Sequence, residues 1–327
     1  MARRYSFTPR RGHALPHDAS SFAILIPIVV AVALVGLGLV VAGGSGAPPG
    51  EGCSGDECTP IVAAATATPS PPASLAAEPE APPLLSGYAA AVIEVPCGVT
   101  VYAVNEALRL APASLVKMMT AIVALERAEA DEIVEIEIDG AALSMAVDAT
   151  AMGLRPGDRL PLIDLIYGLL LRSGHDAAVV IAEHIAGDEA AFVSLMNQKA
   201  TALGLSDTTF ANVSGLDHPG QLISSLDAAL LGVELLKEPL LAEAVATAEY
   251  QPAWTRGPIT NLNLLLSHYP GAVGVKTGFT DLAGQTIVAA ADRDGRRLIT
   301  SVLHSEDLYV DAAALLNWAF ANTAPAC

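Results

Sequence analysis

The chain has 327 residues, of which 52% are hydrophobic and 16% charged, and its formal net charge at pH 7 is −18. This acidity disfavours nucleic acid and anionic lipid as partners, so we expect no nucleic-acid binding. The four cysteines have no histidine or second cysteine pair at zinc-ligand spacing, and the sequence therefore predicts neither a metal site nor a cofactor.

A single uncharged segment, residues 22–42, is 21 residues long. That length is enough to cross a bilayer as a helix, so we predict one transmembrane segment. Four arginines and one acid precede it, so residues 1–21 are expected to be a basic cytoplasmic tail. A cleaved signal peptide is the alternative, although this apolar run is long for one. The predicted location is the cell membrane, single-pass, with the catalytic domain on the extracytoplasmic side.

The remainder divides by composition. Residues 43–86 are rich in Pro, Ala and Gly and predict a disordered linker. Residues 87–320 contain alternating strand and helix patterns and predict one working domain, followed by a tail at 321–327. All four cysteines lie on the presumed outer side, where three pairings are open. Cys53 and Cys58 share a short loop, whereas Cys97 and Cys327 flank the domain at its two ends.

The domain is expected to begin with a hairpin, "YAAAVIEV" and "VTVYAV", split by Pro96, Cys97 and Gly98. Pro112 is expected to open a helix that runs to about Arg127. Further helices are predicted at 162–186 (one helix or a pair), 189–203, 225–236 and 310–321, and further strands at 273–277, 286–291 and 297–303. Strands at both ends with helices between them indicate an α/β protein of the α+β kind. Its single antiparallel sheet is assembled from both termini and flanked by helices.

Ser114 and Lys117 in "APASLVKMMTA" are three positions apart, which places both side chains on one helix face. A neutral lysine can deprotonate a serine nucleophile, but its pKa must first fall from about 10.4 through burial or a neighbouring cation. A Ser-x-x-Lys pattern alone is weak, because it equally fits two ordinary helix residues.

Two later motifs can supply the missing groups. Lys276 lies at the end of the predicted strand 273–277, followed by Thr277 and then Gly278, and these three residues could hold a carboxylate. A lysine at the end of an edge strand is also a common solubility device. Ser173 and His175 interrupt a very apolar helical region. There Ser173 could relay a proton, or could simply cap the next helix.

The ordered set Ser-x-x-Lys, Ser-Gly-His and Lys-Thr-Gly resembles the active-site triplet of the low-molecular-mass penicillin-binding D-alanyl-D-alanine carboxypeptidases, the group of penicillin-binding protein 5. The likeness extends over "LRPGDRLPLIDLIYGLLLRSGHDAA", "FVSLMNQKATALGLSDTTFANVSGLDHPG" and "YPGAVGVKTGFTDLAGQTIVAAA". It implies a fold like that of β-lactamases and transpeptidases.

The resemblance also implies a mechanism. Ser114 would attack the bond between two terminal D-alanines of a peptidoglycan stem peptide with Lys117 as base, and Ser173 would return a proton to the departing D-alanine. Lys276 and Thr277, beside Gly278, would bind the terminal carboxylate. The backbone N–H groups of Ser114 and Phe279 would form the oxyanion hole. By the same resemblance β-lactams would acylate Ser114 as covalent inhibitors, and the enzyme would act in cell-wall remodelling.

Two positions depart from the family pattern. His175 stands where the family has an asparagine that contacts the substrate, and neutral imidazole can make one donation and one acceptance in its place. Leu222 stands where the family usually has a histidine, with His218 four residues earlier. These departures motivate an alternative, a membrane-anchored pseudoenzyme that binds peptidoglycan without cleaving it. A class A β-lactamase is disfavoured because the required acid-x-x-Leu-Asn is missing from "TTFANVSGLDHPG", and a transpeptidase remains a further alternative.

Overall fold

A five-stranded antiparallel sheet runs through the computed structural model, which describes residues 80–327. Its strand order is β2-β1-β9-β8-β7. The strands span Ala89–Val95 (β1), Val99–Val104 (β2), Ala272–Thr280 (β7), Gly284–Arg293 (β8) and Arg296–Ser305 (β9). Ala90 of β1 pairs with Val302 of β9, so the first and last strands of the domain are neighbours. The predicted hairpin, the three later strands and their assembly into one sheet are thereby confirmed.

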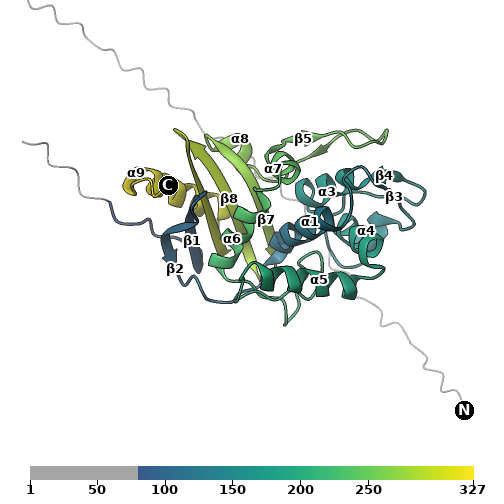
Figure 1. Cartoon of the computed structure of the whole chain (residues 1–327), viewed down its shortest axis with the longest axis horizontal. Helices are drawn as coiled ribbons and strands as arrows, with labels where there is room; N and C mark the ends of the chain where they lie inside the picture. Colours follow the sequence, from purple (N-terminus) through teal and green to yellow (C-terminus); the bar gives the residue numbers. More distant parts are fainter. Residues whose placement is uncertain (1–79) are drawn as a thin grey trace, which may run out of the picture. The chain divides into compact units, whose positions relative to one another are not determined.

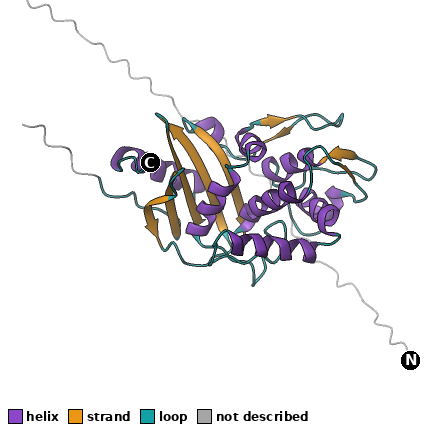
Figure 2. Ribbon diagram, viewed as in Figure 1, coloured by secondary structure: helices purple, strands orange, loops and turns teal. Residues whose placement is uncertain are grey.

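Both faces of this sheet are covered by helices. Successive side chains of a strand point to opposite faces, so each strand contributes to both cores. On one face Ala90 and Val92 pack with residues of the last helix, Leu308–Asn322 (α9). On the other face Ala91 and Ile93 join the larger core formed with the remaining helices. Figure 1 shows α9 on one side of the sheet and α1, α3, α4, α5 and α6 on the other, and Figure 2 shows the strands between these helical layers.

The larger core is built around one buried helix. Helix α1 (Val116–Arg127) follows a 3-10 turn (Ala113–Leu115), so regular α-helix begins later than Pro112 predicted. The other helices are α2 (Gly140–Met145), α3 (Leu162–Leu171), α4 (His175–Ala186), α5 (Glu189–Ala202), α6 (Ser225–Leu235), α7 (Pro239–Ala246) and α8 (Leu265–His268). The apolar segment 162–186 is therefore a pair of helices.

Side-chain caps mark where several helices begin. The side chains of Asp139, Asp188, Ser224 and Asp307 accept hydrogen bonds from the backbone N–H groups of the first turns of α2, α5, α6 and α9. Each satisfies a donor that a helix start would otherwise leave unpaired. Two small two-stranded antiparallel sheets complete the structure. They are formed by β3 (Ile133–Glu135) with β4 (Arg159–Pro161) and by β5 (Glu249–Tyr250) with β6 (Ile259–Thr260).

The ends of the described part are fastened to the domain. Cys97 and Cys327 form a disulfide, with 5.8 Å between their Cα atoms. Ser86, at the end of the predicted linker, donates to the Asp311 carboxylate at 2.7 Å. The backbone carbonyl of Glu80 accepts from Trp318 Nε1 at 2.7 Å. Residues 80–86 are thus bonded to the folded domain.

The predicted cytoplasmic tail, the transmembrane helix, the first part of the linker, and Cys53 and Cys58 lie outside the described residues. Between residues 80 and 327 no helix combines the length and apolar character needed to cross a bilayer.

Candidate active site

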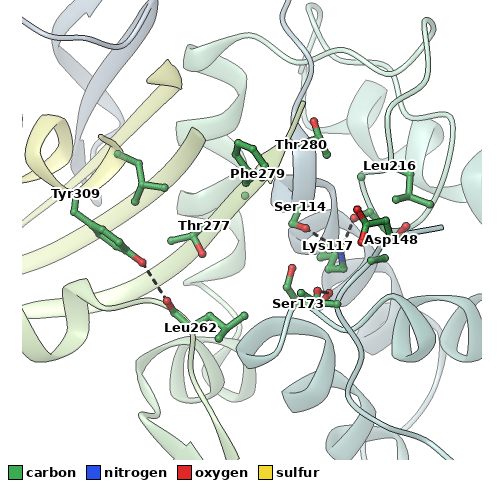
Figure 3. A pocket seen from close by; sticks show the side chains of 16 residues that line it. Ser114, Lys117, Asp148, Ser173, Leu216, Leu262, Thr277, Phe279, Thr280 and Tyr309 are labelled. Atoms are coloured by element: carbon green, nitrogen blue, oxygen red, sulfur yellow. Dashed lines mark hydrogen bonds between the residues drawn. The ribbon is translucent and has the colours of Figure 1, made fainter. Parts of the chain in front are cut away.

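Ser114 lies in the 3-10 turn that leads into α1, at the wall of a pocket of about 320 Å³. The pocket opens between the edge strand β7 and the helices (Figure 3). It is lined by Ser114, Lys117, Asp148, Ala149, Thr150, Ser173, Ser214, Gly215, Leu216, Leu262, Thr277, Gly278, Phe279, Thr280, Leu308 and Tyr309. The three sequence motifs therefore meet at one cavity.

Lys117 contacts the candidate nucleophile directly. Its Nζ lies 3.0 Å from Ser114 Oγ and also donates to the backbone carbonyl of Ser214. The side chain is 3% exposed, and burial together with the nearby Lys276 holds the pKa of Lys117 well below its usual range. A neutral amine that donates one hydrogen bond to the Ser214 carbonyl can still accept a hydrogen bond from the Ser114 hydroxyl through its lone pair. A general base requires this arrangement.

Lys276, at the centre of β7, is likewise buried. Its Nζ donates to Ser173 Oγ at 3.1 Å and to the carbonyl of Thr277 at 2.9 Å. Burial lowers the pKa of Lys276 to about 7. Ser173 sits at the break between α3 and α4 with a φ of 57°, a left-handed conformation that turns the chain between the two helices. The sheet and the helical layer are joined through these two side chains.

Gly278 allows β7 to approach the nucleophile closely. A methyl group at Gly278 would lie 2.8 Å from the Ser114 backbone nitrogen and 2.7 Å from Thr286 Oγ1, distances too short for carbon. Thr277 and Phe279, on either side, line the pocket, and Phe279 is 64% exposed. Only glycine at this position keeps the Ser114 N–H next to the strand.

His175, the first residue of α4, is buried behind the pocket wall and is absent from its lining. Its Nδ1 lies 2.9 Å from Ser214 Oγ. Burial and the nearby Lys117 lower the pKa of His175, although Glu189 and Asp176 oppose this effect, so the imidazole is neutral at pH 7. His175 therefore contacts the residue whose carbonyl holds Lys117. Direct binding of substrate by His175 stays a prediction.

Leu222 is the other departure from the family pattern, and it lies with His218 outside the Ser114 pocket. Both line a second groove, together with Tyr88 and His304, and neither lines the pocket around Ser114. His218 accordingly does not stand in for the missing histidine at that pocket.

Sequence analysis did not identify the residues that hold the Ser173-Gly174-His175 motif in place. The Asp176 carboxylate is completely buried and accepts backbone N–H bonds from Met152, Gly153 and Leu154 at 2.8 to 3.0 Å. These bonds fix the segment that carries Asp148 and the two residues after it into the pocket. The one sequence feature that could have drawn attention to Asp176 is its place as an acid in the first turn of a strongly apolar helix. Asp148, Ser214, Leu216, Leu262 and Tyr309 carried no motif of their own.

Comparison with known proteins agrees with this geometry. Residues 76–307 match the family model described as D-alanyl-D-alanine carboxypeptidase. The chain is 32% identical over 240 residues to D-alanyl-D-alanine carboxypeptidase DacF of Bacillus subtilis, covering 71% of this chain and 62% of that protein. It is 36% identical over 227 residues to DacC of Escherichia coli, covering 65% and 56%. The chain thus spans between 56% and 62% of the length of these relatives.

Solved structures show the same fold. The DD-transpeptidase of Streptomyces K15 aligns with a TM-score of 0.70 and 29% identity, over 74% of this chain and 100% of that one. A D-alanyl-D-alanine carboxypeptidase from Mycobacterium tuberculosis aligns with a TM-score of 0.71 and 30% identity, over 76% and 96%.

Proposed function

The chain belongs to the D-alanyl-D-alanine carboxypeptidase family, and on that basis we propose that it is a serine-type carboxypeptidase that removes the terminal D-alanine from peptidoglycan stem peptides. One observation carries the proposal above the others. The buried Lys117 amine lies 3.0 Å from Ser114 Oγ, in a pocket that Ser173 also lines, and Lys276 Nζ contacts Ser173 Oγ from behind the pocket wall.

In the proposed reaction Ser114 Oγ attacks the carbonyl carbon of the penultimate D-alanine as its proton passes to Lys117. The oxyanion that forms accepts hydrogen bonds from the backbone N–H groups of Ser114 and Phe279. The C–N bond then breaks, and the proton that Lys117 accepted passes through Ser173 to the departing amine, which leaves Lys117 neutral again. This leaves the peptide as an ester on Ser114, and water, deprotonated by Lys117, releases it.

The substrate's terminal carboxylate would lie against Thr277, with the buried Lys276 behind it. A carboxylate brought close to Lys276 favours the charged form of that lysine. Because the pKa of Lys276 is about 7, this group can change its charge as the substrate binds and leaves. The apolar side of the pocket, formed by Leu262, Phe279 and Tyr309, would exclude water from the acyl-enzyme.

We also propose that the domain works outside the cytoplasmic membrane, anchored by residues 22–42 and spaced from the bilayer by the Pro-rich segment that follows. The disulfide between Cys97 and Cys327 is consistent with an oxidising compartment.

The test follows D-alanine release from diacetyl-L-Lys-D-Ala-D-Ala by the full chain, together with covalent labelling by a fluorescent penicillin. We expect both, and we expect Ser114→Ala to lose both. Labelling without release of D-alanine would instead support the peptidoglycan-binding pseudoenzyme, and absence of labelling would contradict the acyl-enzyme.

A second function is favoured by one comparison. The alignment with the DD-transpeptidase of Streptomyces K15 covers 100% of that protein and 74% of this chain. A transpeptidase shares the acylation step but transfers the acyl group to an amine. Adding glycine as an acceptor would divert product from the shortened peptide to a glycine adduct only if this second function applies.

A further inference from the structure

Within residues 80–327, Asp148 is the only acidic residue that lines the Ser114 pocket. It is solvent-exposed, and among residues 80–327 its carboxylate has no hydrogen bond and no ion pair. The Lys117 amine, which also lines the pocket, is occupied by Ser114 and Ser214. A carboxylate therefore faces the pocket without a partner.

The backbone on either side of Asp148 is held in place by hydrogen bonds. Asp148 adopts a left-handed conformation, with a φ of 53°, at the turn that follows α2. The N–H of Ala149 donates to the Ser144 carbonyl at 2.9 Å, and Thr150 Oγ1 donates to the Ser173 carbonyl at 2.7 Å. The Thr150 carbonyl in turn accepts from the N–H of His175 at 2.8 Å. Asp148 is thus tied to the same segment that carries Ser173.

The side of the pocket on which Asp148 lies indicates which part of a substrate it meets. In Figure 3 Thr277 and Tyr309 lie on one side of Ser114, and Asp148 and Leu216 lie on the opposite side. If the leaving D-alanine and its carboxylate occupy the Thr277 side, the rest of the peptide extends from Ser114 toward Asp148. This step rests on the function proposed above.

An unpaired carboxylate at the mouth of a pocket attracts a cation and repels an anion. Stem peptides that carry a diamino acid before the two D-alanines present such a cation, the side-chain ammonium group. We propose that Asp148 is a specificity-determining residue that binds the side-chain ammonium of the residue preceding the D-alanyl-D-alanine pair. The enzyme accordingly prefers peptides in which this amine is free over peptides in which it is acylated or cross-linked.

Two tripeptides that differ only in this amine test the inference. One is Nα-acetyl-L-Lys-D-Ala-D-Ala, with a free ammonium, and the other is its Nε-acetylated form. With the full chain at low ionic strength we expect kcat/KM for D-alanine release to favour the free ammonium by up to about fivefold, the range for an exposed ion pair. The preference should shrink as salt is added, because exposed charges are screened.

Variants separate Asp148 from the general acidity of the protein. In Asp148→Asn the ratio of the two kcat/KM values should fall to near one, and in Asp148→Lys it should fall below one. Both values come from the same sample, so the ratio does not depend on the folded fraction. Asp281→Asn is the matched control, since it removes another exposed carboxylate, outside the pocket lining, and should keep the wild-type ratio.

The outcomes are distinguishable. Equal rates for both peptides in the wild type, or an unchanged preference in Asp148→Asn, would overturn the inference and leave the proposed function in place. Failure to release D-alanine from either peptide would overturn the proposed function, and this inference with it.

Discussion

Lys276 Nζ lies 3.1 Å from Ser173 Oγ although the two residues are 103 positions apart in the chain. This contact joins the edge strand of the sheet to the break between two helices. It also places a second amine near Lys117, whose pKa it lowers. The catalytic chemistry we propose therefore depends on a long-range contact that forms only when both layers are packed.

Burial of Lys276 should make stability depend on pH. Below pH 7 the lysine is protonated in the folded and unfolded states, and folding carries the full cost of burying the charge. Between pH 7 and about 10.4 only the unfolded chain keeps the proton, so stability rises with pH. We expect this contribution to be on the order of 1 kcal/mol per pH unit between pH 7 and 9, and to be absent in Lys276→Met.

Urea unfolding at pH 7, 8 and 9 measures this difference. Lys117 is buried as well and contributes with the same sign, so the wild type should show the steeper rise and the variant a shallower one. Lys237→Met, which changes an exposed lysine, is the control and should leave the slope unchanged. Equal slopes in the wild type and Lys276→Met would show that Lys276 keeps an ordinary pKa.

His175 should give acylation an additional dependence on acid. Neutral imidazole can exchange a hydrogen bond with Ser214 Oγ in either direction, whereas imidazolium can only donate and adds a positive charge near Lys117. Because the pKa of His175 is lowered, mainly by burial, we expect the rate of β-lactam acylation to fall more steeply below pH 6.5 in the wild type than in His175→Asn. In His175→Asn only the protonation of Lys117 would lower the acylation rate as the pH falls.

Stopped-flow acylation of the two proteins across this pH range provides the measurement. His218→Asn makes the same chemical change in the second groove and should retain the wild-type profile. Identical pH profiles for the wild type and His175→Asn would show that His175 does not contribute to the pH dependence of acylation. Loss of all acylation in His175→Asn would show that asparagine cannot replace this histidine.

The disulfide between Cys97 and Cys327 should contribute to stability because it joins positions 230 residues apart. Closing a long loop restricts the unfolded chain, and we expect Cys327→Ser to lower the free energy of unfolding by about 2 to 4 kcal/mol. Urea unfolding checks this, with the reduced wild type as a second route to the same state. A variant as stable as the oxidised wild type would contradict it.

The three sequence motifs could be predicted to meet because their order resembles the family's active-site triplet, and because the Ser114–Lys117 pair lacks a cation that Lys276 can supply. Ser114 needs a base, Lys117 needs burial or a neighbouring cation, and Lys276 is such a cation. Strands such as Ala89–Val95 were also predictable, because their β-branched and apolar runs are bounded by turn residues.

Other features had no local signal. The small sheet of Glu249–Tyr250 with Ile259–Thr260 has two residues per strand, too few for alternation to be seen. Asp148 reaches the pocket through a left-handed turn that tertiary contacts hold in place. The cysteine pairing remained open among three choices, because it depends on where α9 ends relative to the first hairpin.

The central claim is that Ser114 is the nucleophile, and intact-protein mass spectrometry after incubation with benzylpenicillin tests it most directly. We predict a mass increase of one penicillin on the wild type, mapped by peptide digestion to Ser114, and no increase on Ser114→Ala. Ser144→Ala, which alters a serine outside the pocket lining, should still be labelled. An adduct that survives Ser114→Ala, or that maps to another residue, would contradict the account.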